Sequence, residues 1–292
     1  MQLIQGQVIA QLTQDKIKQE IEALLRALGR KPGLAFIRVG ENPASKVYIQ
    51  MKKRKCLEVG ILSFDQELPE NISQEELVSK VQALNNDPNI DGILIQLPLP
   101  PHLNTLFILE QIAPSKDVDG FHPINMGKLL LGDPNGFIPC TPKGIHHLLL
   151  ESGIPIAGKH VVIVGRSNIV GKPLAALLMQ KDPLCNATVT VVHSGSRNLP
   201  ALCREADILI AAIGQPKFIK KEMIKPGACV IDVGINKITE PGQLTPSLVG
   251  DVDFEEVAPL CSYITPVPGG VGPMTITYLL ANTLKGFKKN HI

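Results

Sequence analysis

Short apolar runs alternate along the chain with segments in which apolar residues recur every three or four positions. A continuous apolar run of this length is typical of a strand that is buried on both faces of a parallel sheet. The predicted strands lie at 33–39, 61–66, 91–97, 160–165, 188–192, 207–213 and 229–233. Their alternation with helical patterns predicts an α/β fold built in two successive β/α series.

The first helix is predicted from apolar residues at helical spacing between Ile17 and Leu28, with Thr13 as N-cap and Gly29 just past its end. Ser73 and Glu76 form a capping box that opens a later helix. Further helices are predicted at about 44–59, 104–112, 141–153 and 273–289, and directly after residue 173. The stretch 117–140 is rich in Gly, Pro, Asn and Asp, and is predicted to be loop.

Composition indicates a folded protein and argues against nucleic-acid and membrane partners. The 292 residues are 44% hydrophobic and 19% charged, which predicts a folded chain with room for two domains. A net charge of +2 and 4% aromatic residues, with no Trp, give no reason to expect a nucleic acid or a membrane surface as partner. No secretory signal and no apolar run of about 18 residues is visible, so a cytoplasmic location is expected.

The cysteines carry no signature of a metal site or a disulfide framework. No two of them stand in a C-x-x-C spacing, and no His clusters with them. We therefore expect no bound metal and six buried, reduced thiols. These are Cys56, Cys140, Cys185, Cys203, Cys229 and Cys261.

A glycine turn joins the strand at 160–165 to a helical stretch, and this context is typical of a dinucleotide site. Gly165 allows the tight turn, Gly171 lets the helix pack close to the sheet, and free N–H groups at the helix start can bind a pyrophosphate. The pattern is GxSxxxG rather than GxGxxG, so an ordinary β/α turn that needs glycine stays an alternative.

The end of the next strand indicates which dinucleotide binds. Sites for NAD place an acidic residue there to bind the ribose 2′-hydroxyl. This chain has His193, Ser194, Ser196 and Arg197 instead, and Arg166 adds positive charge. Arginine and hydroxyl groups favour the 2′-phosphate of NADP, although any one of these residues could also belong to a solvated turn.

A lysine is the candidate catalytic group of the first half. Tyr48 and Lys52 lie four residues apart in a predicted helix and share one face. A run of four cations at 52–55 is usually a solvated face, but four consecutive helical residues sweep about 300° and cannot share one stripe. Lys52 continues the line of Tyr48, so we predict that it turns inward, where a desolvated lysine can act as a base.

Three further places in the sequence are candidate ligand contacts: the end of a buried strand, an acidic loop and the segment before the last helix. Gln96 follows the apolar run 93–95 at the carboxyl end of the predicted strand, which is the edge of the sheet where ligands bind. Loop backbone could also supply the hydrogen bonds that its side-chain amide needs. Asp117 and Asp119 lie in a loop, as ligand-binding acids or as part of an Asp/Gly turn. The Pro/Gly-rich segment 266–273 fixes a specific backbone path, either for close approach to a ligand or as an interdomain hinge.

These motifs together resemble the bifunctional methylenetetrahydrofolate dehydrogenase/methenyltetrahydrofolate cyclohydrolase family over nearly the whole chain. The resemblance rests on Y-x-x-x-K at 48–52, QLPLP at 96–100, KDVDGFHP at 116–123, PCTPKG at 139–144, GRSxIVGxP at 165–173 and TPVPGGVGPMT at 265–275. It implies two α/β domains flanking a cleft, with a Rossmann-like NADP-binding domain at 142–271. The other domain would comprise 1–141 plus 272–292, with the C-terminal helix packing back on it.

The resemblance also implies an activity and roles for residues. The family oxidises 5,10-methylenetetrahydrofolate with NADP and hydrolyses the methenyl product to 10-formyltetrahydrofolate, usually as a homodimer. Lys52 would be the catalytic lysine that Gln96 positions, Asp119 would bind the pterin and Tyr48 would pack on the reduced folate. The implied substrate contacts are completed by Ile95, Leu97, Pro268, Gly269, Gly270, Val271 and Gly272. The implied NADP contacts are Gly165, Arg166, Ser167, Ser194 and Ile235.

Two alternatives remain at this stage. A monofunctional NAD(P) dehydrogenase explains the glycine turn but not Tyr48, Lys52, Gln96 and Asp119 together. A non-catalytic nucleotide-binding or folate-sensing module would be favoured if one of those four residues were missing, and none is.

Overall fold

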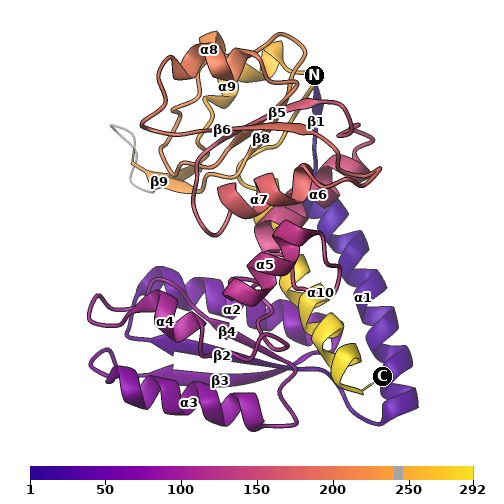
Figure 1. Cartoon of the computed structure of the whole chain (residues 1–292), viewed down its shortest axis with the longest axis vertical. Helices are drawn as coiled ribbons and strands as arrows, with labels where there is room; N and C mark the ends of the chain where they lie inside the picture. The colour runs from indigo at the N-terminus through magenta and orange to yellow at the C-terminus, as the bar shows by residue number, and fades with distance from the viewer. Residues whose placement is uncertain (240–245, 292) are drawn as a thin grey trace. The chain divides into compact units, whose positions relative to one another are not determined.

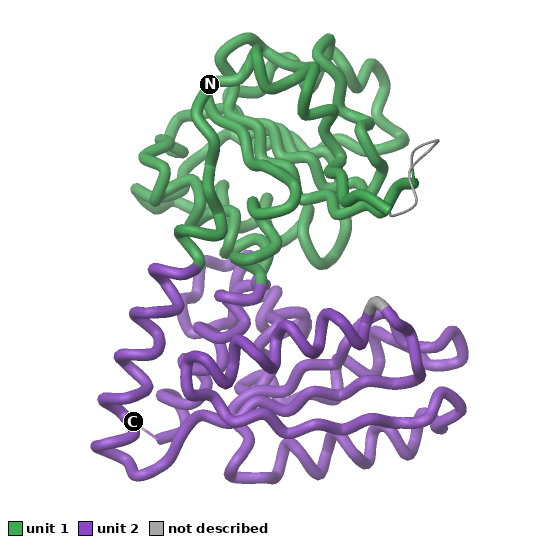
Figure 2. The backbone as a smooth tube through the Cα atoms, turned by 180° about the vertical axis from the view of Figure 1, so that it is seen from behind, with its two compact units in different colours: residues 1–10, 141–275 green, residues 11–140, 276–292 purple. Residues whose placement is uncertain are grey.

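Two compact units make up the chain in a computed structural model that describes residues 1–239 and 246–291. Unit 1 comprises residues 1–10 and 141–275, and unit 2 comprises residues 11–140 and 276–292 (Figure 2). Each unit thus combines two separate stretches of the chain. The domain boundaries predicted from the sequence, and the cleft between the domains, stay predictions.

Unit 2 contains a three-stranded parallel sheet. Its order is β3 (Leu62–Leu68), β2 (Gly33–Val39), β4 (Gly92–Ile95), so β2 lies in the centre (Figure 1). Every residue of β2 is buried, as its largely apolar sequence predicts, and Arg38 is the one charged residue in it. The connecting helices are α2 (Pro43–Val59), α3 (Gln74–Asn86) and α4 (Thr105–Leu109).

Two long helices from the ends of the chain complete the core of unit 2. Helix α1 (Gly6–Leu28) contributes Ile17 and Ile21, and helix α10 (Val271–His291) contributes Leu280 and Phe287, to one buried apolar cluster. Phe36 of the central strand belongs to the same cluster. The prediction that the C-terminal helix packs back on the first domain is confirmed.

Unit 1 contains a six-stranded parallel sheet, which confirms the predicted Rossmann-like architecture. The order is β1 (Gln2–Leu3), β11 (Tyr263–Ile264), β8 (Cys229–Asp232), β7 (Ile208–Ala211), β5 (His160–Val164), β6 (Thr188–Val192). From β5 the chain runs to β6 on one side and then crosses to β7 on the other. The point between β5 and β7 is therefore the topological switch point, where doubly wound sheets bind their ligands.

Shorter elements surround this sheet. The helices of unit 1 are α6 (Cys140–Glu151), α7 (Gly171–Leu178), α8 (Leu199–Arg204) and α9 (Phe254–Val257), with 3-10 turns at Lys221–Met223 and Ala258–Leu260. An antiparallel pair, β9 (Asn236–Ile238) and β10 (Ser247–Val249), follows β8.

The prediction that residues 117–140 form only loop is wrong, because helix α5 (Pro123–Leu131) lies within them. The Nδ1 atom of His122 accepts a hydrogen bond from Ile124 N at 3.1 Å, and Pro123 occupies the first turn. Gly132 ends the helix in the left-handed conformation, with φ +73°. Pro and Gly therefore mark the two ends of a helix here.

The predicted N-cap of the first helix is also wrong, because α1 begins at Gly6 and Thr13 lies inside it. The exposed apolar residues Val8 and Leu12 broke the amphipathic pattern on which the boundary was based. Glycine is required at position 6, since a Cβ there would lie 2.7 Å from the carbonyl carbon of Gly270. Helix α4 ends three residues earlier than predicted, and α6 begins one residue earlier.

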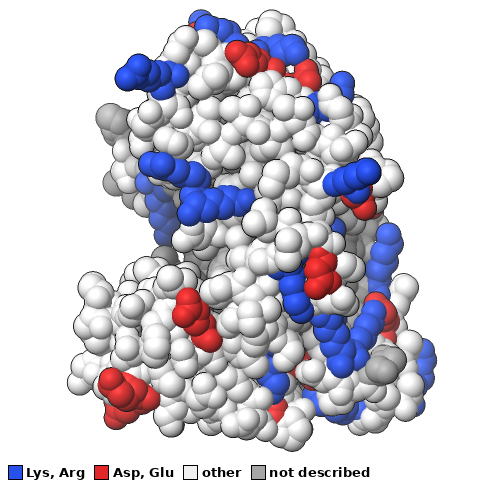
Figure 3. Space-filling model, in the orientation of Figure 1, with Lys and Arg blue, Asp and Glu red and all other residues white. Residues whose placement is uncertain are grey.

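Surface and thiol chemistry are unexceptional. Over residues 1–239 and 246–291, no helix combines the length and apolar character that a bilayer span requires. Basic and acidic side chains are scattered over the face shown in Figure 3, with wide uncharged areas between them. All six cysteines are reduced and buried, as predicted.

Candidate active site

Lys52 differs from the three cations that follow it on α2. Its Nζ donates a hydrogen bond to Gln96 Oε1 at 3.0 Å, and the side chain is half-buried. Lys53 is paired with Asp65, whereas Arg54 and Lys55 both bind the carboxylate of Glu58. Neighbouring acids therefore neutralise the other three cations, while a neutral amide faces Lys52.

The amide of Gln96 is fixed in orientation by the end of strand β4. Its backbone N–H donates to Ile37 O at 2.9 Å, which continues the sheet ladder by one residue. Its side-chain Nε2 donates to Leu97 O at 2.8 Å, so Oε1 is the atom left to accept from Lys52. Ile95 is buried just before it, and the Leu97–Pro98 peptide bond just after it is cis.

The two loop acids have different surroundings. The Asp117 carboxylate accepts hydrogen bonds from Phe121 N, His122 N and Asn125 Nδ2 at 2.8–3.2 Å, so it holds the loop together. Among the described residues Asp119 has no such set of backbone partners, and the Cys140 thiol lies 3.9 Å from its Oδ1. Burial raises the pKa of Asp119 to about 6, although the nearby charge of Lys52 lowers it. Asp119 is therefore the acid available to a ligand, and it can carry a proton near neutral pH.

Two residues behind Asp119 were missed as site residues by reasoning from the sequence. Asn282 on α10 donates from Nδ2 to Val118 O at 2.8 Å and to Ile138 O at 3.1 Å, which ties together the two chain segments beside Asp119. The Cys140 thiol lies 3.4 Å from Val118 O, and burial raises its pKa well above the usual value, so it stays protonated. Cys140 belongs to the PCTPKG motif, whereas nothing local marked Asn282.

Tyr48 lies one helical turn before Lys52 and is 38% exposed. Val47 and Met51, on the same part of α2, are also exposed. Apolar and aromatic surface thus adjoins the lysine, as an aromatic ligand that stacks beside a polar group would require.

The glycine turn of unit 1 has the close packing expected of a dinucleotide site. Gly165 has φ +131°, and a Cβ there would lie 2.9 Å from the carbonyl carbon of Ala212 after β7. A Cβ on Gly171 would lie 2.8 Å from the carbonyl carbon of Gly165, so α7 begins against the turn itself. The Ser167 hydroxyl accepts from Val170 N at 3.1 Å, which closes the turn just before that helix.

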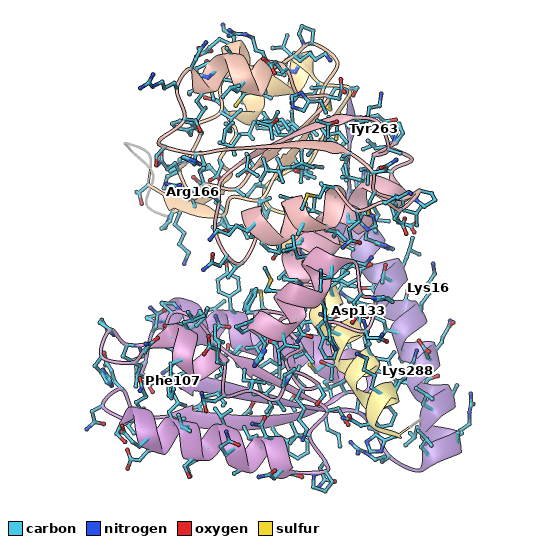
Figure 4. All side chains as sticks on the ribbon, in the orientation of Figure 1. Lys16, Phe107, Asp133, Arg166, Tyr263 and Lys288 are labelled. Atoms are coloured by element: carbon cyan, nitrogen blue, oxygen red, sulfur yellow. The ribbon has the colours of Figure 1, made fainter. Side chains whose placement is uncertain are left out.

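The turn after β6 presents hydroxyl and cationic groups and no carboxylate between residues 193 and 197. Ser196 is occupied by the turn, because its hydroxyl accepts from His193 N at 2.9 Å. Ser194 and Arg197 are exposed, as is Arg166 on the glycine turn (Figure 4). A phosphorylated ribose would meet donors and positive charge here, so these residues fit NADP.

The Pro/Gly-rich segment before α10 lies beside the loop after β8. The Val267–Pro268 bond is cis and Gly269 has φ +102°. A Cβ on Gly272 would lie 3.5 Å from Ile235 Cδ1, so Ile235 and Gly272 are neighbours in unit 1. The structure thus brings Tyr48, Lys52, Gln96 and Asp119 together in unit 2, whereas the predicted NADP contacts and residues 268–272 belong to unit 1.

Comparisons with known proteins support the same assignment in both halves. Residues 4–119 match the family described as tetrahydrofolate dehydrogenase/cyclohydrolase, catalytic domain, and residues 139–291 match its NAD(P)-binding domain. The bifunctional protein FolD of Protochlamydia amoebophila is 55% identical over 99% of this chain and 98% of its own.

Solved structures agree with these matches. The FolD methylenetetrahydrofolate dehydrogenase/cyclohydrolase of Campylobacter jejuni superposes with a TM-score of 0.93 at 47% identity, covering 99% of each chain. The Trypanosoma brucei enzyme, crystallised with NADP cofactor and an inhibitor, superposes with a TM-score of 0.92 at 41% identity, covering 98% of this chain and 97% of its own.

Proposed function

Since the chain belongs to the tetrahydrofolate dehydrogenase/cyclohydrolase family, we propose how its residues divide the work of the two reactions. The enzyme oxidises 5,10-methylenetetrahydrofolate to the 5,10-methenyl cation with NADP, and then hydrolyses the cation to 10-formyltetrahydrofolate. The observation that carries the assignment of residues is the hydrogen bond from Lys52 to Gln96 at the carboxyl end of β4, beside Asp119.

The oxidation needs alignment more than proton transfer. The reacting carbon lies between two nitrogens, whose lone pairs stabilise the cation that remains after hydride leaves. NADP supplies the hydride acceptor when it is bound. Gly165, Arg166 and Ser167 hold its phosphates, Ser194 binds the 2′-phosphate end, and Ile235 contacts it from the loop after β8. These residues contribute through positioning, which is worth several kcal/mol in a bound pair of reactants.

The folate contacts that we propose follow from the family resemblance. Tyr48 packs against the ring system, while Ile95, Leu97 and residues 268–272 contact the substrate. Asp119 hydrogen-bonds the pterin, and its pKa of about 6 lets it either donate or accept near neutral pH.

Hydrolysis requires a proton carrier, which we assign to Lys52. Water adds to the methenyl carbon and forms a new C–O bond, and Lys52 Nζ takes the proton that this water gives up. The added hydroxyl then gives up its remaining proton as the bond from the carbon to N5 breaks, N5 takes up that proton, and the formyl group stays on N10. The proton on Lys52 is released to solvent, so the reaction liberates one proton overall. Gln96 holds the Nζ in place through its fixed amide oxygen. General catalysis of this kind typically contributes about 10²–10⁴-fold.

The experiment is to assay Lys52→Met for both reactions, with Lys53→Met as its matched control. Lys53 is the next residue on the same helix but is paired with Asp65 on β3. We expect Lys52→Met to lose hydrolysis of methenyltetrahydrofolate by at least about 100-fold, and Lys53→Met to keep it. Undiminished hydrolysis in Lys52→Met would remove this residue from the mechanism. A wild-type chain that forms no methenyl product would refute the oxidation itself.

The preference for NADP over NAD rests on Arg166, Ser194 and Arg197. We expect a higher kcat/KM with NADP than with NAD, because these residues favour a 2′-phosphate. Stronger use of NAD in steady-state kinetics would overturn this assignment.

Assembly and location are proposed from the family resemblance. We propose a homodimer in the cytoplasm, and the six reduced thiols are consistent with a reducing compartment. Sedimentation equilibrium that gives the mass of a single chain would contradict the dimer.

A further inference from the structure

Two buried aspartates lie beneath the loops at the carboxyl edge of the unit 1 sheet. Asp232 ends strand β8 and Asp251 follows β10, and their exposed fractions are 4% and 0%. Neither carboxylate takes part in the two proposed reactions, and burial of two carboxylates in one place is costly unless both are well hydrogen-bonded.

Asp232 holds the segment that carries Asp251. Its Oδ1 accepts from Asp251 N at 2.9 Å and from Gly234 N at 3.0 Å, and its Oδ2 accepts from Val252 N at 2.9 Å. Glycine at position 250 permits this approach, because a Cβ there would lie 2.4 Å or less from the Asp232 carboxyl group. Two backbone donors of this segment, Asp251 N and Val252 N, therefore fix the position of residue 251 relative to the end of β8.

Asp251 in turn holds two different loops. Its Oδ2 accepts from Ile213 N at 2.7 Å and from Gly214 N at 2.9 Å, in the loop that follows β7. Its Oδ1 accepts from Asn236 Nδ2 at 2.9 Å, directly after Ile235 in the loop that follows β8. One carboxylate thus joins the loops of two adjacent strands.

The β7 loop borders the glycine turn, and the β8 loop borders the Pro/Gly-rich segment. The Ala212 carbonyl, just before Ile213, is the group against which Gly165 packs, and Ile235 contacts the Pro/Gly-rich segment at Gly272. In the sheet order β8-β7-β5-β6, the β7 and β8 loops lie on one side of the β5 turn and the Ser194–Arg197 turn lies on the other. If the pyrophosphate lies over the β5 turn and the 2′-phosphate end lies over β6, the nicotinamide end lies over β7 and β8.

We propose that Asp251, held in place by Asp232, is a positioning residue for the nicotinamide half of the bound dinucleotide. It does not touch the cofactor but fixes the two loops against which the nicotinamide nucleotide packs. The inference rests on the proposed function, because it assumes that a dinucleotide occupies the switch point of unit 1.

The test compares a whole cofactor with its adenine half. Binding of NADP⁺ and of adenosine 2′,5′-bisphosphate is measured by calorimetry for the wild type, Asp251→Ala and Asp251→Asn. Loss of Asp251 should raise the Kd of NADP⁺ by at least about tenfold, because two loop N–H groups lose their acceptor. The Kd of the bisphosphate, which has no nicotinamide, should stay within about twofold.

Conservative replacement should rescue binding. The amide oxygen of Asp251→Asn can still accept from Ile213 N and Gly214 N, and Asn236 can rotate its amide to match the new donor. A purely global loss of stability would not discriminate between the two ligands. Hydrolysis of methenyltetrahydrofolate in the absence of NADP should also stay within about threefold of wild type, because it depends on Lys52 in unit 2.

Asp253→Ala is the matched control. It lies two residues further on, where its carboxylate pairs at 2.6 Å with Lys220, at the far end of the segment after β7 and six residues beyond Gly214, so its Kd values should equal those of the wild type. If Asp251→Ala does not fold, Asn236→Ala removes the tie to the β8 loop alone and should still weaken NADP⁺ binding selectively.

The outcomes separate the two hypotheses. Equal weakening of both ligands, or no weakening of either, overturns the role of Asp251. A wild-type protein that binds neither NADP⁺ nor the bisphosphate overturns the proposed function instead.

Discussion

A single methyl group at position 171 should separate the two activities of this enzyme. In Gly171→Ala the new Cβ would lie 2.8 Å from the carbonyl carbon of Gly165 and 3.0 Å from the Cα of Arg166. Both neighbours are backbone atoms of the glycine turn, so no side-chain rotation can relieve the overlap. Since non-bonded carbons pack at about 3.5–4.0 Å, helix α7 or the turn has to move by about 1 Å.

The size of the effect follows from that displacement. A misplacement of about 1 Å can cost about 100-fold in rate when a reaction depends on alignment, as hydride transfer does. We therefore expect kcat/KM for NADP-dependent oxidation to fall about 100-fold, or about 2.7 kcal/mol of transition-state stabilisation. Hydrolysis of the methenyl compound without NADP should be nearly unchanged, because Lys52, Gln96 and Asp119 all lie in unit 2.

The assay follows methenyltetrahydrofolate by absorbance, as it forms in one reaction and disappears in the other. Gly127→Ala is the matched control, since a Cβ at this position of α5 would meet nothing within 4 Å. It should keep both activities and raise stability by about 0.5–1 kcal/mol. The reasoning is refuted if Gly171→Ala oxidises its substrate within about threefold of the wild-type rate, or if both activities fall equally.

Two further predictions concern stability. Burial raises the pKa of Asp119 from 3.8 to about 6, so the stability that its neutral form contributes is present below pH 4 and is lost as the pH rises through 6. The free energy of unfolding in urea is measured at pH 4 and pH 7 for the wild type and Asp119→Asn. From pH 4 to pH 7 the variant should gain at most about 3 kcal/mol relative to the wild type, and an equal change in both proteins would exclude the effect. The Ser73→Ala variant should lose about 1 kcal/mol, because Ser73 Oγ accepts from Glu76 N at 3.1 Å in a complete capping box. Stability is measured by thermal unfolding, in which Ser79→Ala, on the same helix, should be as stable as the wild type. Equal losses of stability in both variants would contradict the capping contribution.

The parts of the fold with a strong local signal could be predicted from the sequence. Strands β2 and β6 were predicted at 33–39 and 188–192, residue for residue, because each is a short run dominated by apolar or β-branched residues. The capping box of α3 was found because its two partners lie three residues apart. The prediction that Gln96 lies at a ligand-binding edge needed one further step, namely that ligands gather at the carboxyl ends of parallel strands, and its pairing with Lys52 was implied by the family resemblance.

The features that were missed depend on distant parts of the chain. Helix α5 was missed because Pro123 and Gly132 were taken as signs of a loop. They stand at the two ends of the helix, which becomes clear only once His122 is known to be its N-cap. Asn282 reaches carbonyl groups 164 and 144 residues away, and the partners of Asp251 in the β7 loop lie 38 and 37 residues away. Hydrogen bonds over such separations follow from the folded topology and leave no local pattern.

The division of unit 2 into two stretches of chain has a consequence for biosynthesis. Residues 276–292 supply Leu279, Leu280, Leu284 and Phe287 to its core, yet the ribosome makes them only after the 135 residues from 141 to 275. At about 5–20 residues per second, residues 11–140 wait about 10 s for the helix that covers them. During that interval their apolar surface is open to chaperones and proteases, so the nascent chain is most vulnerable in the half that carries Lys52, the proposed catalytic lysine.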